Sequence, residues 1–212
     1  ERMRKMYLSA PLPFVGQKRM LAKEFMKVLE QYPDGTLFVD LFGGSGLLSH
    51  IAKSLKPHST VIYNDFDNYR FRMKHIPQTN QLLADIREMV GNSVPRHKII
   101  KGELRERILS RIEQEENTTG YVDFITLSSS ILFSMKYKLS VQDMRKEALY
   151  NNIRKTGYPE CADYLEGLEI VSCDYKEVFN RYKDIPGVVF LVDPPYLSTD
   201  VGTYNMYWNM AD

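Results

Sequence analysis

The stretch Phe38-Val39-Asp40-Leu41-Phe42-Gly43-Gly44-Ser45-Gly46 predicts a buried strand that runs into a glycine-rich turn. A helical pattern begins directly after it, near Leu47. Small residues in such a turn let a ligand approach the backbone closely, and the amides that open the helix can bind an anionic group. Two alternatives stay open: a purely structural tight turn, and a dinucleotide-binding turn, although the glycine spacing lacks the Gly-x-Gly-x-x-Gly pattern of the latter.

Outward from this stretch, strand and helix patterns alternate along the chain. Apolar runs typical of buried strands occupy residues 36–41, 60–64 and 187–192, with a fourth candidate at 168–172. Helical spacing of apolar residues occupies 18–31, 47–55, 78–90, 101–115 and 141–155. This order predicts an α/β fold, a doubly wound and mainly parallel sheet with a helical inserted subdomain. Ligands are expected outside the carboxyl ends of the strands.

Composition bounds the class of protein. The chain has 212 residues, is 43% hydrophobic and contains no apolar run of the roughly 20 residues that a membrane span needs. No signal core is present at the N-terminus, so we expect a cytoplasmic protein with no membrane partner. Cys161 and Cys173 lack a metal-ligand spacing and do not suggest a disulfide scaffold, so they are expected to be packing residues.

Charge is nearly balanced overall, at +1, but it is not evenly distributed. Lysines and arginines outnumber acids between residues 66 and 156, which favours phosphate contacts there. The alternative is that these residues form the solvated faces of ordinary helices.

A second acidic position follows the next predicted strand. The run Val61-Ile62-Tyr63-Asn64-Asp65 places Asp65 about twenty residues beyond the glycine turn. In nucleoside-binding folds of this topology, a carboxylate at the end of the second strand accepts hydrogen bonds from both ribose hydroxyls. Taken alone, Asp65 is equally compatible with a helix cap or a turn. Together with the glycine turn, it favours a ribose-binding role.

The tetrapeptide Asp193-Pro194-Pro195-Tyr196 directly follows the apolar run 187–192. An exocyclic amine on an aromatic base is a poor nucleophile because its lone pair is delocalised into the ring, so a catalyst needs acceptors for both amine hydrogens. Asp193 supplies a carboxylate and Pro194 a backbone carbonyl, and the two prolines keep the turn rigid. Tyr196 offers a flat face for an extruded base, a contact worth roughly 1–3 kcal/mol. The alternative is a proline-terminated strand with an incidental acid and aromatic residue.

These motifs resemble those of the Dam-type, D12 class N6-adenine DNA methyltransferases, in the order that puts the cofactor motifs before the catalytic one. Pro13-Phe14-Val15-Gly16-Gln17-Lys18 resembles the N-terminal cofactor motif, residues 40–46 the glycine motif, and residues 193–196 the catalytic tetrad. The resemblance implies a Rossmann-like sheet of the S-adenosylmethionine-dependent methyltransferase type. It also implies methyl transfer from S-adenosylmethionine to the N6 amino group of a flipped-out adenine in duplex DNA.

The resemblance also implies roles for single residues. Lys18 would contact the methionine carboxylate of the cofactor, Asp40 its ammonium group and Asp65 its ribose. Asp174, in Cys173-Asp174-Tyr175, would accept from the cofactor's adenine amino group. The remaining pocket residues are expected to be Phe14, Gly16, Phe42, Gly43, Gly44 and Gly46. A sulfonium ion is already an activated methyl donor, so no metal is expected.

By the same comparison, residues 1–66 and 167–212 form the cofactor-binding catalytic domain, and residues 67–166 form a helical insertion that recognises the DNA target. We expect a monomer. The candidate phosphate contacts are Arg70, Arg72, Lys74, Arg96, Lys98, Lys136 and Lys138, with Tyr137 among them. Residues 127–139 lack the asparagine- and glycine-containing pattern that Dam-type enzymes show there, so the resemblance does not predict which DNA sequence is recognised.

The chain ends sixteen residues after Tyr196, whereas the family continues with strands that complete the sheet. We therefore expect C-terminal strands to be missing, and residues 201–210 to form either a loop over the active site or a free end. Two other functions stay in competition. One is an RNA or protein amine methyltransferase, although those that modify glutamine have asparagine in place of Asp193; the other is an inactive fragment that binds cofactor or nucleic acid.

Overall fold

The computed structural model describes residues 4–15 and 21–192 and has an α/β fold. Its main sheet has the strand order β5-β2-β1-β6, and all its neighbouring strands are parallel. The strands are β1 (Phe38–Asp40), β2 (Val61–Asn64), β5 (Glu169–Val171) and β6 (Val189–Leu191). Each lies inside a predicted strand run, so the prediction of a mainly parallel sheet is confirmed, and the arrangement is compatible with a Rossmann-like methyltransferase fold.

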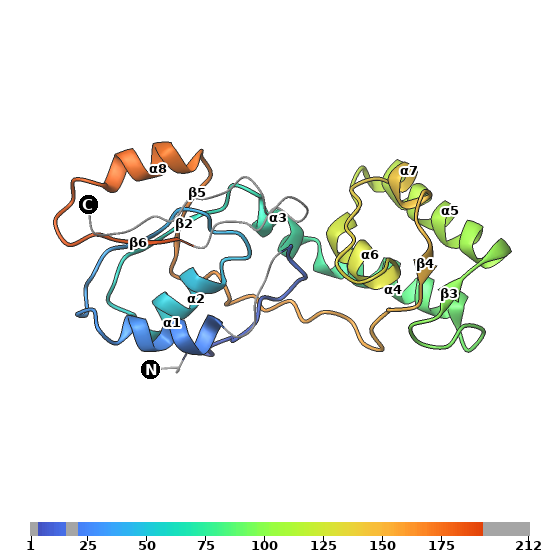
Figure 1. The fold of residues 1–212 in the computed structure, drawn as a ribbon, viewed down its shortest axis with the longest axis horizontal. Helices are drawn as coiled ribbons and strands as arrows, with labels where there is room; N and C mark the ends of the chain where they lie inside the picture. The colour runs from blue at the N-terminus through green and yellow to red at the C-terminus, as the bar shows by residue number, and fades with distance from the viewer. Residues whose placement is uncertain (1–3, 16–20, 193–212) are drawn as a thin grey trace, which may run out of the picture.

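Helices cover both faces of this sheet (Figure 1). On one face lie α1 (Leu21–Leu29) and α2 (Leu47–Leu55), and on the other lies α8 (Tyr175–Tyr182). Side chains alternate between the faces: Phe38 packs in the cluster that contains α2 residues, whereas Val39 packs against Val178 of α8. Both faces are therefore apolar, which explains why these strands have continuous apolar sequences.

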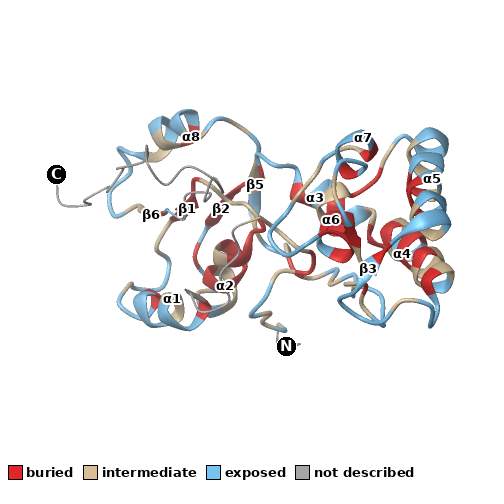
Figure 2. Ribbon diagram, turned by 45° about the vertical axis from the view of Figure 1, so that its right-hand side comes forward, coloured by how far each residue is buried: buried red, intermediate tan, exposed pale blue. Residues whose placement is uncertain are grey.

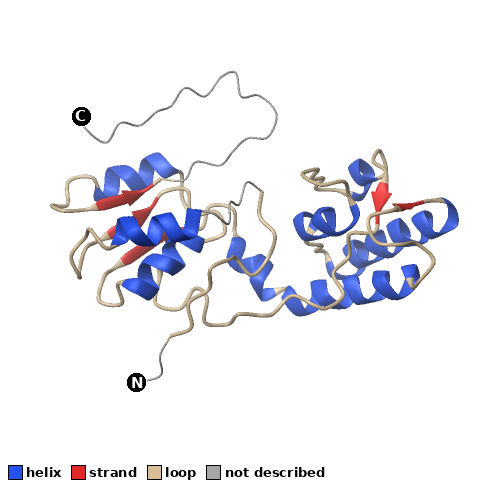
Figure 3. Cartoon of the chain, turned by 60° about the horizontal axis from the view of Figure 1, so that its bottom comes forward, coloured by secondary structure: helices blue, strands red, loops and turns tan. Residues whose placement is uncertain are grey.

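A second group of helices lies to one side of the sheet, and residues 76–153 are called the helical part below (Figure 1). It contains α4 (Ile76–Val90), α5 (Gly102–Thr119), α6 (Phe124–Ile131) and α7 (Val141–Met144). A small antiparallel sheet joins β3 (Ile99–Ile100) to β4 (Leu149–Tyr150), far from the main sheet (Figure 3). The helical part has its own hydrophobic cluster, and buried residues occur both there and around the main sheet (Figure 2).

Between the two groups stands the short helix α3 (Tyr69–Lys74). Tyr69 and Ile76 pack in the hydrophobic cluster of the main sheet, as does Tyr164, which lies in the segment that returns from the helical part to the sheet. Two cross-connections therefore link the sheet to the helical part, one through α3 and one through residues 154–168.

The predicted helix over residues 141–155 is wrong. Ser140 caps α7 by accepting from the Asp143 amide at 3.1 Å, but the helix ends at Met144 and the chain then forms β4. Val141, Met144 and Leu149 are all buried in the cluster of the helical part. Their apolar spacing reflects this shared burial, and backbone pairing with β3 sets the local structure.

The cysteine prediction agrees with the structure. Cys161 and Cys173 are free, and each packs against the edge of a hydrophobic cluster of the main sheet. Within the described ranges, no helix is both long and apolar enough to cross a membrane.

A buried histidine fastens the N-terminal segment to the sheet. The backbone amide of Tyr7 donates to Nε2 of His50 at 2.8 Å, so the proton of the imidazole lies on Nδ1, which donates to the carbonyl oxygen of Tyr164 at 2.7 Å. The ring stacks on Tyr164 with 4.7 Å between centroids. Tyr164 in turn donates to the carbonyl oxygen of Ser45, in the glycine turn, at 2.8 Å.

This arrangement predicts a pH-dependent stability. Burial lowers the pKa of His50, Arg4 acts in the same direction, and the hydrogen bond to Tyr164 and the charge of Asp163 oppose the shift. Neutral His50 therefore stabilises the fold fully above about pH 6.5, the value for an unfolded chain. This stabilisation is lost as the pH falls towards the lowered pKa, by at most about 1.4 kcal/mol per pH unit.

Urea unfolding measured between pH 7.5 and pH 5 checks this expectation. His50→Gln should flatten the pH dependence, whereas His58→Gln, at an exposed position, should leave it unchanged. Equal slopes for the wild type and His50→Gln would contradict the role of His50.

Candidate functional site

The carboxyl ends of all four parallel strands meet at one edge of the main sheet. Asp40 ends β1 and lies in register with Leu191 of β6, so the chain leaves β6 beside the glycine turn. Asn64 ends β2 and is followed by Asp65, and Asp174 follows β5 at the start of α8. The predicted cofactor residues that the structure describes are thus brought to the same edge.

Asn64 holds three of these strand ends at fixed spacing. Its Nδ2 donates to the carbonyl oxygens of Leu41 at 2.9 Å and Cys173 at 2.8 Å, and its Oδ1 accepts from the amide of Cys173 at 3.1 Å. The residue is 1% exposed, so these bonds do not compete with water. This role is not visible in the sequence, because one polar residue at a strand end has no periodic pattern.

The glycine turn wraps around the side chain of Tyr63. A Cβ atom at Gly43 would overlap the Tyr63 ring and the carbonyl oxygen of Asn64, and one at Gly46 would lie 3.1 Å from the same ring. The Tyr63 hydroxyl donates to the carbonyl oxygen of Gly44 at 2.7 Å. Packing inside the protein is therefore the reason for Gly43 and Gly46, in agreement with the tight-turn alternative.

Gly44 differs because its neighbour belongs to the N-terminal motif. Its φ is +52°, and a Cβ atom there would lie 3.1 Å from the ring of Phe14. Phe14 packs edge-on against Tyr69, with 6.0 Å between centroids. The structure thus brings Phe14 and the glycine turn together, as predicted for one pocket. Gly16 and Lys18 lie outside the described residues.

The helix after the glycine turn begins without a side-chain cap. Gly46 occupies the N-cap position of α2 and makes no side-chain cap hydrogen bond. Asp40 lies next to this end but is only 1% exposed, and its Oδ2 accepts from the Ser49 hydroxyl of α2 at 2.7 Å. Its contact with a ligand ammonium group stays a prediction.

Asp65 has a structural task in the described contacts. Its Oδ1 accepts from the Tyr69 amide at 2.6 Å and its Oδ2 from the Arg70 amide at 3.2 Å, and the Arg70 side chain lies 3.4 Å away. The carboxylate is fully buried and fixes the start of α3. The helix-cap alternative therefore describes these contacts, and ribose binding stays a prediction.

Asp174 is exposed and stands beside two aromatic rings. It caps α8 by accepting from the amide of Lys176 at 2.8 Å, which leaves its carboxylate open to solvent. The next residue, Tyr175, lies against Phe42 with 4.8 Å between ring centroids. A flat apolar surface next to a free acceptor fits an adenine with an exocyclic amine.

The predicted catalytic residues Asp193, Pro194, Pro195 and Tyr196 lie outside the described residues. The structure describes β6, which leads to them along the chain. Among the residues it does describe, no group of three His, Cys, Asp or Glu side chains could hold a metal ion.

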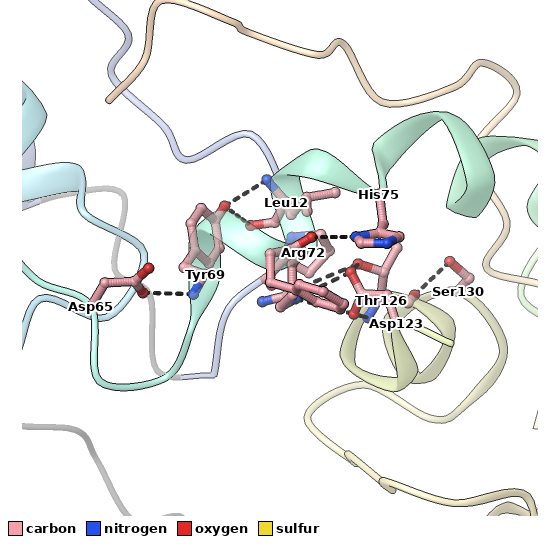
Figure 4. A network of polar contacts seen from close by, with 10 residues as sticks. Leu12, Asp65, Tyr69, Arg72, His75, Asp123, Thr126 and Ser130 are labelled. Atoms are coloured by element: carbon pink, nitrogen blue, oxygen red, sulfur yellow. Dashed lines mark hydrogen bonds and ion pairs between the residues drawn. The ribbon is translucent and has the colours of Figure 1, made fainter. Parts of the chain in front are cut away.

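One predicted phosphate contact is wrong. Arg72 is 7% exposed, and its Nε donates to both carboxylate oxygens of Asp123 at 3.1 Å (Figure 4). Counting charges along a sequence does not reveal such burial. The ammonium groups of Lys136 and Lys138 pair with the carboxylate of Glu147, with N–O distances of 2.7 and 3.6 Å. The candidates with exposed side chains are Arg70, Lys74, Arg96, Lys98 and Lys136.

The contact at Gly43 gives a stability prediction. Gly43→Ala should lower the free energy of unfolding by about 2 kcal/mol, because the added Cβ forces the glycine turn away from the Tyr63 ring and the Asn64 carbonyl of β2. Gly35→Ala is the control: its φ is +85° but nothing lies near the added atom, so it should cost about 1 kcal/mol through backbone strain alone. Urea unfolding compares them, and a Gly43→Ala protein as stable as the wild type would rule out the contact.

Comparison with known proteins gives two matches. Residues 14–212 match the family described as D12 class N6 adenine-specific DNA methyltransferase. A Haemophilus influenzae protein named "Putative methyltransferase" is 39% identical over 215 residues, which cover 99% of this chain and 72% of that protein. The family match takes in Phe14, the glycine turn, Asp65, Asp174 and the stretch beyond β6. The chain therefore belongs to the D12 class N6 adenine-specific DNA methyltransferase family.

Proposed function

We propose that this chain transfers the methyl group of S-adenosylmethionine to the N6 amino group of an adenine that is flipped out of duplex DNA. The observation that carries the proposal is the register of β6 on β1, in which Leu191 pairs with Asp40. In the sequence, Asp193-Pro194-Pro195-Tyr196 begins two residues after Leu191, and Leu191 lies at the edge that holds the glycine turn. A methyl donor and an amine acceptor at this edge would be neighbours.

The residues of this edge fit the parts of S-adenosylmethionine. The methionine end is assigned to the glycine turn and the start of α2, whose amides suit a carboxylate, with Phe14 beside Gly44. Gly16 and Lys18 are proposed to contact the same end of the cofactor. The adenine end is assigned to Phe42, Tyr175 and Asp174. When bound, the sulfonium group supplies an activated methyl group, so no metal is needed.

For the ribose, Asp65 remains the proposed acceptor, although its carboxylate is covered in the described structure. Each carboxylate oxygen has two lone pairs, and the bonds to the α3 amides use only part of this capacity. Rotation of the exposed Arg70 side chain, which lies 3.4 Å from Oδ2, would open one side of the carboxylate.

In the proposed chemistry, Asp193 and the carbonyl of Pro194 accept hydrogen bonds from the two N–H groups of the target amine. This favours the geometry in which the nitrogen lone pair is directed at the methyl group, and the rigid prolines hold the acceptors in place. Tyr196 stacks on the extruded base.

DNA is proposed to lie along residues 67–166, with residues 1–66 and 167–212 as the catalytic domain of a monomer. Exposed basic side chains occur at two places within the proposed DNA-binding segment. Arg70 and Lys74 belong to α3, beside the sheet, and Arg96 and Lys98 lie before β3. Their charges suit the phosphates of a duplex.

Methyl transfer tests the proposal directly. Radiolabelled S-adenosylmethionine is incubated with an adenine-containing duplex, with RNA and with protein, and label is expected only in the duplex. Asp193→Ala removes one amine acceptor and should lower the rate by about 100-fold or more, because a preorganised transition-state partner is lost.

Controls separate the acceptor from the stacking surface. Tyr196→Phe keeps the ring and should retain much of the activity, whereas Tyr196→Ala should lose it. The same duplex carrying N6-methyladenine should take up no label. Label in RNA or protein alone, or an Asp193→Ala enzyme as fast as the wild type, would refute the proposal.

A further inference from the structure

Three segments that are far apart in the sequence meet at Arg72 of α3 (Figure 4). Its Nε donates to Asp123, as described above, and its Nη2 donates to the Thr126 hydroxyl at 3.2 Å and to the carbonyl oxygen of Pro13 at 2.7 Å. Asp123 caps α6 by accepting from the Thr126 amide at 3.1 Å. One guanidinium therefore joins the helical part to the residue just before Phe14.

The same N-terminal segment is held at a second point on α3. The Tyr69 hydroxyl accepts from the Leu12 amide at 2.9 Å and donates to the Leu12 carbonyl at 3.1 Å. The Tyr69 amide donates to Asp65, which fixes α3 to the end of β2. Leu12 and Pro13 are thus oriented by one helix, which leaves the Phe14 ring over Gly44.

Burial makes the ion pair a demanding contact. Arg72 is 7% and Asp123 3% exposed, so removal of either partner leaves a desolvated charge. Nη1 of Arg72 is buried without a hydrogen-bond partner among the described residues. The unpaired nitrogen adds a desolvation cost, which the directed bonds of the same guanidinium to Asp123, Thr126 and Pro13 offset.

We propose that Arg72 and Asp123 are positioning residues for the cofactor site. Together they fix the carbonyl of Pro13, and through it the Phe14 ring, at a place that the helical part helps to define. The inference rests on the proposed function, because that function assigns Phe14 and Gly44 to the S-adenosylmethionine pocket. Arg72 and Asp123 do not touch the reacting atoms in this proposal, and each acts through the backbone of Pro13.

A matched pair of substitutions tests this role in the full chain. Arg72→Lys keeps the charge but cannot donate in a fork to Asp123 and Pro13 together. Arg111→Lys makes the same change at α5, where Arg111 bridges Asp85 at 3.0 Å and Glu115 at 2.8 Å. Both arginines are largely covered by protein, and only the first contacts the N-terminal segment.

Two measurements are made on each protein. Amide hydrogen exchange of residues 7–15 should be faster in Arg72→Lys and unchanged in Arg111→Lys. Calorimetric affinity for S-adenosylmethionine should fall about tenfold in Arg72→Lys alone, as for loss of a charged hydrogen bond. In steady-state assays its KM for S-adenosylmethionine should rise by the same factor with little change in kcat, a split that general destabilisation does not produce.

Asp123→Asn is the second variant and decides the test if Arg72→Lys does not fold. It keeps an acceptor for the α6 amide but loses the negative charge. Exchange of residues 7–15 should again be faster and affinity for S-adenosylmethionine lower, by smaller factors than in Arg72→Lys. Wild-type exchange and wild-type affinity in a folded variant would overturn the proposal. Failure of the wild type to bind S-adenosylmethionine would instead remove the proposed function, and the exchange of residues 7–15 alone would then decide whether Arg72 positions this segment.

Discussion

The carboxyl edge of the sheet depends on the buried side-chain amide of Asn64. The strand registers of β1, β2 and β5 extend to Asp40, Asn64 and Val171, and the predicted site residues lie at or just beyond those positions. The Asn64 amide extends these connections by binding the backbone after β1 and after β5. Each hydrogen bond stabilises the fold by about 1 kcal/mol. A buried amide that loses its partners would destabilise the fold by more than that, so the three bonds are expected to form together.

The two neighbours of Asn64 extend the same control. Tyr63 points to the glycine turn and sets its shape through the contact with Gly43 and the hydrogen bond to Gly44. Asp65 fixes the start of α3, and α3 in turn orients the N-terminal segment and meets α6. Three consecutive residues thus place the glycine turn, the end of β5 and the connection to the helical part. Under the proposed function, the methyl donor and its acceptor are aligned at this edge, which would require fixed positions for all three segments.

The sequence allowed the strands and α2 to be predicted, because buried parallel strands have unbroken apolar runs and a glycine turn marks the first helix. The family followed from residue identities in short motifs, which carry chemistry whatever the local periodicity. Prediction failed where burial decides: the apolar spacing of residues 141–155 resembles a helix but comes from β4 and a loop packed in one cluster. The prediction of Arg72 as a phosphate contact fails for the same reason, since its buried partner Asp123 is far along the chain. Asn64 was missed because its value lies in backbone groups that no sequence pattern shows.

In the proposed function, the edge organised by Asn64 binds S-adenosylmethionine. Calorimetric titration of S-adenosylmethionine into the wild type, Asn64→Asp and Asn80→Asp tests it most directly. Asn64→Asp keeps the shape but sets a carboxylate oxygen against the carbonyls of Leu41 and Cys173, so affinity should fall by about tenfold or more. Asn80 makes a comparable pair of bonds with the Tyr158 backbone, away from the sheet edge, and Asn80→Asp should bind as the wild type does. A wild type that does not bind, or an Asn64→Asp protein with undiminished affinity, would contradict the account.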